Sequence, residues 1–98
     1  TAIQSHVDGG WRAYANAARY YNETAKDPAR ALALVDASLA VKETWYNSWI
    51  KAQILAGQNN FKDAYPLAQK AFDLGSKDAN FFFKADVEKA LAEWKLKI

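Results

Sequence analysis

Two stretches of the chain repeat each other at a spacing of 33 to 34 residues. Each reads as a helix, a short turn and a second helix, and Trp11 and Trp45 begin the two copies 34 positions apart. The other matched pairs are Ala18 with Ala52, Tyr21 with Leu55, Ala31 with Ala64 and Leu39 with Phe72. Such a period is typical of folds in which helical hairpins stack, because one hairpin cannot bury its apolar face alone. The repeat therefore favours an all-α fold.

Apolar residues recur at helical spacing through most of the chain, and turn residues separate the helical stretches. The pattern predicts helices at about 11–25, 28–41, 44–58, 61–74 and 78–95. Asp27, Thr44 and Asn60 are suitable N-caps, and Ser76 or Asp78 is a suitable cap for the last helix. Gly75 is the expected C′ residue after the fourth helix.

These helices predict one domain at 11–98, preceded by a lead-in or linker at 1–10 that ends at the helix-disfavouring pair Gly9-Gly10. The domain divides into two helix-turn-helix repeats, at about 11–43 and 44–76, and a C-terminal capping helix at about 78–96. The apolar stripe of the capping helix is expected to consist of Phe82, Val87, Ala90, Leu91 and Trp94.

The residues of the repeat resemble the tetratricopeptide repeat. A small residue stands in the middle of each first helix, at Ala18 and Ala52, and an alanine stands early in each second helix, at Ala31 and Ala64. Small residues let paired helices approach to about 8–10 Å. The turn glycine of that pattern is replaced by Asn59 in the second copy. The resemblance implies a tetratricopeptide-like α-α superhelix.

A closer resemblance covers about residues 11–95. The segments WRAYANAARYYNE, KAQILAGQNNFKDA and VEKALAEWK are similar to the helical tail of a bacterial family of unknown function. In that family a β-rich N-terminal domain precedes a tetratricopeptide-like tail, often in exported proteins. The resemblance implies a periplasmic or exported setting and a missing N-terminal domain, and it implies no catalytic residue.

The side chains that catalysis and metal binding require are scarce. The chain has no cysteine and a single histidine, His6, which we interpret as a surface residue. Asp86, Glu88 and Glu93 on the last helix are interleaved with lysines, which indicates a solvated face and not acid–base chemistry. We therefore predict no enzyme activity, no metal and no cofactor.

Charge patterning argues against nucleic acid and membrane partners. The 13 basic and 11 acidic residues are mixed along the chain, and the formal net charge is only +2. Phosphate contacts need clustered cations, so we expect no nucleic-acid partner. The longest weakly charged run, 31–41, is too short to span a bilayer.

The remaining candidate surface is the side of the first helices that faces away from the second helices. The candidate partner-binding residues are Arg12, Arg19 and Asn22 in the first copy and Tyr46, Trp49 and Gln53 in the second. Ala15 is expected to lie on the same free side. Aromatic residues and Arg are favoured anchors for peptides. Trp49 has two interpretations, a core residue or a ligand-facing one.

The leading functional hypothesis is a non-enzymatic interaction or scaffold module. Its partner would be a protein or peptide, or the missing N-terminal domain. One alternative is a helical accessory domain of an exported enzyme whose active site lies elsewhere in the polypeptide. Another is self-association through residues 81–83 and the tryptophans.

Overall fold

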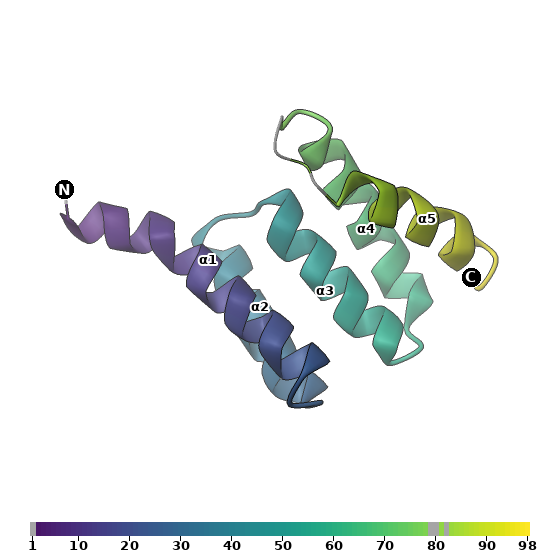
Figure 1. Cartoon of the computed structure of the whole chain (residues 1–98), viewed down its shortest axis with the longest axis horizontal. Coiled ribbons are helices and arrows are strands. Elements are labelled where there is room, and N and C mark those ends of the chain that lie inside the picture. The colour runs from purple at the N-terminus through teal and green to yellow at the C-terminus, as the bar shows by residue number, and fades with distance from the viewer. Residues whose placement is uncertain (1, 79–80, 82) are drawn as a thin grey trace.

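The computed structural model describes residues 2–78, 81 and 83–98, and the side chains from residue 10 onward within these ranges. These residues form five α-helices (Figure 1): α1 (Ala2–Glu23), α2 (Pro28–Val41), α3 (Trp45–Gly57), α4 (Phe61–Gly75) and α5 (Lys84–Lys95). The described part of the chain contains no strand, so the predicted all-α class is confirmed.

The helices form two hairpins and a fifth helix (Figure 1). α1 packs along α2, α3 packs along α4, and α5 packs on α4. The two hairpins meet because α3 also contacts α2 and α1. The central position of α3 is the main feature of the arrangement, since its side chains pack both within its own hairpin and against the first hairpin.

The N-terminal segment differs from the expected lead-in. α1 begins at Ala2 and continues through Gly9 and Gly10 without a break. Glycine in a helix interior costs only about 1 kcal/mol relative to alanine, so two glycines weaken the helix without ending it. The first part of α1 extends beyond the other helices (Figure 1). The expectation for the His6 side chain lies outside the described residues.

The turns follow the predicted chemistry in part. Asp27 caps α2 by accepting a hydrogen bond from the Arg30 amide at 3.2 Å, and Thr44 caps α3 as predicted. Asn59 closes the turn after α3 with φ 63°, a conformation that Asn tolerates better than most residues. Asn60 occupies the N-cap position of α4 as predicted, but its side chain makes no capping hydrogen bond, and its Nδ2 donates to Asp63 Oδ2 instead.

Two core clusters share α3 between them. Ile50 and Ile54 point toward the first hairpin and pack with Ala15, Ala18, Ala31 and Val35. Trp49, Ala52 and Leu55 point the other way and pack with the alanines of α4 and with Val87, Ala90 and Trp94 of α5. The helical spacing of Trp49, Ala52 and Leu55 predicts one of these buried faces, and the central position of α3 adds the other.

Two predictions for α1 are wrong. Helical spacing groups Tyr14 with Trp11, Ala18 and Tyr21 on one face and so predicts that Tyr14 is buried, but 42% of its surface is exposed. Ala15, expected on the free side, is fully buried. The reason is that α1 contacts α3 as well as α2. The buried arc of α1 is therefore centred between these two neighbours, which turns Tyr14 out toward solvent.

The connection between α4 and α5 also differs from the prediction. Gly75 is the last residue of α4 and not a C′ residue. α5 begins at Lys84, with Phe83 at the N-cap position in place of Ser76 or Asp78. Phe81 packs on Trp45, with ring centroids 5.0 Å apart. An aromatic contact therefore precedes the first residue of α5. The expectation for Phe82 lies outside the described residues.

Gly75 is required by the position of the Phe81 ring. A Cβ added at Gly75 would lie 2.5 to 2.6 Å from three ring carbons of Phe81, closer than van der Waals contact permits. Gly57, at the end of α3, has nothing within 4 Å of such a Cβ. Each glycine is the last residue of its helix, but the two differ in the space around them.

We predict that Gly75→Ala lowers the free energy of unfolding by about 1–3 kcal/mol, because the Phe81 ring must shift away from Trp45. Gly57→Ala is the matched control and should leave stability unchanged or raise it by up to about 1 kcal/mol. Urea titration followed by tryptophan fluorescence measures both. A Gly75→Ala variant as stable as Gly57→Ala would contradict the packing of Phe81 on α4.

Candidate partner-binding surface

A buried polar network fixes the start of α3 against the first hairpin. Thr44 and Asn47 form a capping box, in which each side chain accepts a hydrogen bond from the other's amide. Asn47 Nδ2 also donates to Ser38 Oγ at 3.0 Å and to the Lys42 carbonyl at 2.7 Å. Ser38 Oγ in turn donates to the Trp11 carbonyl. The network joins α1, α2 and α3 at one point.

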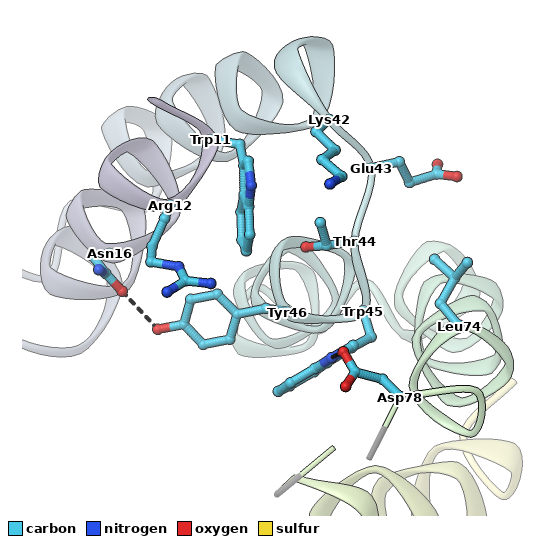
Figure 2. A pocket seen from close by; sticks show the side chains of 10 residues that line it. All are labelled: Trp11, Arg12, Asn16, Lys42, Glu43, Thr44, Trp45, Tyr46, Leu74 and Asp78. Atoms are coloured by element: carbon cyan, nitrogen blue, oxygen red, sulfur yellow. Dashed lines mark hydrogen bonds between the residues drawn. The ribbon is translucent and has the colours of Figure 1, made fainter. Parts of the chain in front are cut away.

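Beside this point lies a hollow of about 620 Å³, which we call the Trp11 hollow (Figure 2). It is lined by Trp11, Arg12 and Asn16 of α1, residues 42–44 of the connection, Trp45 and Tyr46 of α3, Leu74 of α4 and Asp78. Five separate parts of the fold therefore converge on it.

Aromatic rings form much of the wall of the Trp11 hollow. The rings of Trp11 and Tyr46 meet edge to face with centroids 6.4 Å apart, and Trp45 and Tyr46 do so at 5.7 Å. The hydroxyl of Tyr46 donates to Asn16 Oδ1 at 2.8 Å, as Figure 2 shows. The wall is thus ordered by contacts between α1 and α3 before any ligand binds.

Two of the four charged side chains that line the Trp11 hollow have no ion-pair partner among the described residues. The guanidinium of Arg12 lies 5.0 Å from the centroid of the Trp11 ring, and no carboxylate among the described side chains pairs with Arg12 or Lys42. The two carboxylates are engaged: Glu43 pairs with Lys70, and Asp78 Oδ2 accepts a hydrogen bond from the neutral Trp45 Nε1 at 3.0 Å. The hollow therefore offers two unpaired cations, although its lining holds as many carboxylates as cations.

Arg19 lies next to this surface on α1. Its Nε is 3.1 Å from Glu23 Oε2, and its guanidinium lies 5.5 Å from the centroid of the Phe83 ring. The Tyr46 hydroxyl raises the pKa of Arg19 above its usual value, partial burial opposes this shift, and Glu23 adds to it. Arg19 therefore stays cationic and is held in place beside Tyr46.

The structure brings only some of the predicted binding residues together. Arg12 and Tyr46 line the Trp11 hollow, and Arg19 adjoins it. Asn22 lines a second hollow at the other end of α1, with residues 26, 28, 54 and 57–58. Gln53 is half-buried and lines neither hollow.

Trp49 is a core residue, so the ligand-facing interpretation is wrong. Only 3% of its surface is exposed, and its ring stacks on Trp94 with centroids 5.8 Å apart and planes at 19°. α5 occupies the place where a ligand would contact this ring. The rings of Phe81 and Phe83, considered for self-association, are half-buried against Trp45 and Tyr46.

Sequence reasoning missed several residues of the Trp11 hollow. Asn16 follows Arg12 by four residues and shares its side of α1, so helical spacing alone indicates it. No sequence pattern indicates Lys42 or Asp78, because both lie in connections between helices. The course of such connections depends on contacts with residues far away in the sequence. Asn47, which belongs to the polar network beside the hollow, was missed because a polar residue in a helix normally indicates a solvated position.

No protein-family model, no curated protein and no solved structure matches this chain. None of the described helices combines the length and apolarity needed to cross a bilayer. Among the described side chains, no three of the metal-ligating types His, Cys, Asp and Glu cluster together. The hollow therefore presents cationic side chains next to aromatic rings to a ligand.

Two buried serines test the polar network. Ser38 and Ser48 are both fully buried, but only Ser38 makes side-chain hydrogen bonds, since Ser48 Oγ has no partner among the described residues. We predict that Ser38→Ala lowers the free energy of unfolding by about 1–3 kcal/mol, whereas Ser48→Ala changes it by less than about 0.5 kcal/mol or raises it. Thermal denaturation of both variants measures the difference. Equal losses would show that the network adds nothing to stability.

Proposed function

We propose that this chain is a non-enzymatic protein-interaction module whose Trp11 hollow binds an acidic segment of a protein partner. The observation that carries the proposal is the pair of cations in the hollow that lack an ion-pair partner. Arg12 and Lys42 line it without a carboxylate partner among the described residues, while Glu43 and Asp78 are engaged. A carboxylate brought between the two cations supplies the missing counter-charge.

The aromatic wall favours a peptide segment, and not a small anion, as the ligand of the hollow. Trp11 and Tyr46 present ring faces and edges beside the cations, and aromatic residues are common anchors of protein interfaces. Arg12 is held over the Trp11 ring, and a planar guanidinium can bind a carboxylate through two parallel hydrogen bonds. A segment with a carboxylate next to an apolar or aromatic side chain matches both features.

We also propose that the two hairpins are tetratricopeptide-like. Support comes from the order of contacts, with α1 on α2, α3 on α4 and α1 beside α3, and from buried alanines at the matched positions Ala18, Ala52, Ala31 and Ala64. In stacked helical repeats, extended surfaces formed by successive repeats bind partners. α1 and α3 supply five of the ten residues that line the Trp11 hollow, which is consistent with that use.

A random peptide display library tests the proposed partner chemistry. We predict that the folded chain selects peptides rich in Asp and Glu with an aromatic residue nearby, and that their affinity falls as salt is added, because exposed charge pairs are screened. Fluorescence anisotropy of a selected peptide measures the affinity. Selection of basic peptides, or of none, would contradict the proposal.

Charge reversal locates the binding site. We predict that Arg12→Glu combined with Lys42→Glu weakens a selected acidic peptide at least about tenfold. The control combines Lys62→Glu with Lys89→Glu, two exposed positions outside the hollow, and changes the formal charge by the same amount. The control should retain binding. Equal loss in both variants would indicate attraction by net charge alone and not a site.

A further inference from the structure

The Trp11 hollow has two unlike ends. Figure 2 shows the side chains of Arg12 and Lys42 near Trp11, and the carboxylate of Asp78 beside Trp45, away from both cations. The other carboxylate of the lining, Glu43, pairs with a lysine of α4 that does not line the hollow. A ligand that enters the hollow therefore meets cations at one end and the acidic side chain of Asp78 at the other.

Asp78 is held in place by hydrogen bonds on both its backbone and its side chain. Its amide donates to the Gly75 carbonyl at 2.8 Å, and its carbonyl accepts from the Phe81 amide at 3.2 Å. Its Oδ2 accepts from Trp45 Nε1 at 3.0 Å, and the Trp45 ring is itself only 9% exposed and packs on Phe81. The indole N–H is neutral, so this bond orients the carboxylate without changing its formal charge.

The size of the hollow brings its two ends within reach of one short ligand segment. A volume of about 620 Å³ corresponds to a sphere roughly 10 Å across, and an extended chain advances ~3.4 Å per residue. Side chains two residues apart in an extended segment point to the same side. When one ligand carboxylate pairs with Arg12 and Lys42, the side chain two residues away in one direction therefore lies at the Asp78 end.

We propose that Asp78 determines the specificity of the Trp11 hollow by rejecting a second carboxylate of the ligand. The inference rests on the proposed function and names the ligand class within it: a segment with one acidic residue beside uncharged or aromatic side chains, and not an acidic run. Specific interfaces combine attraction to the right partner with repulsion of the wrong one. Here Arg12 and Lys42 supply the attraction, and Asp78 supplies the repulsion.

Three peptides made from one selected acidic peptide test the inference. The first carries a single Asp, and the other two carry a second Asp two residues before it or two residues after it, where the first peptide has Asn. Fluorescence anisotropy measures their affinities for the folded chain. We expect one of the two doubly acidic peptides to bind at least about fivefold more weakly than the single-Asp peptide, because only one direction along the ligand leads to Asp78.

Neutral variants at Asp78 assign this discrimination to one side chain. Asp78→Asn removes the charge and keeps an oxygen that can accept from Trp45 Nε1, so it should abolish the difference between the peptides. Asp78→Ser is a second neutral variant with an acceptor, so the test does not depend on the folding of one protein. Asp73→Asn, at an exposed position of α4 outside the hollow, makes the same change in formal charge and should retain the discrimination.

The proposed function and the role of Asp78 can fail separately. If the single-Asp peptide binds, and Arg12→Glu with Lys42→Glu weakens it, but the second Asp has no effect, the proposed function stands and the role of Asp78 is overturned. A folded neutral variant that still discriminates, or an Asp73→Asn variant that loses the discrimination equally, also overturns it. A chain that binds no acidic peptide overturns both.

Discussion

The structure depends on a single polar side chain, Asn47. Its amide completes the capping box of α3 and donates to Ser38 Oγ and to the Lys42 carbonyl. Through Ser38 the same network reaches the backbone of Trp11. Asn47 is fully buried, and the low local dielectric makes such satisfied bonds strong and unsatisfied ones costly. These hydrogen bonds hold α3 against the first hairpin, and the angle between the two hairpins and the shape of the Trp11 hollow depend on them.

Around this junction the packing uses very small and very large side chains together. Alanines occupy the contacts between paired helices, at Ala18 and Ala31 in the first hairpin and at Ala52 and Ala64 in the second. Aromatic rings fill the wider spaces between hairpins and helix α5, as in the stacking of Trp49 on Trp94. Aromatic rings also pack tightly on the ends of helices: the Phe81 ring lies so close to Gly75 that no Cβ fits there.

Much of the fold could be predicted from the sequence, because it depends on local signals. Period, caps and turns identified α2, α3 and α4 nearly to the residue. The start of α5 could not be predicted, because it depends on contacts between residues distant in the sequence. Phe81 packs on Trp45 and Phe83 packs on Tyr46, each more than thirty residues away. The candidate site was only partly predictable for the same reason: Lys42 and Asp78 lie in connections, and the role of Trp49 depended on where α5 packs.

The two sides of α1 link the core to the Trp11 hollow. Ala15 and Ala18 are fully buried in the cluster that α1 shares with α2 and α3, whereas Arg12 and Asn16 line the hollow. Arg12 and Asn16 stand four residues apart and therefore share one side of the helix. Because α1 is rigid and its alanine side is closely packed, that packing also sets the position of Arg12 and Asn16 relative to Tyr46. A substitution in the core of the first hairpin should therefore disturb the hollow even though it touches no residue of the lining.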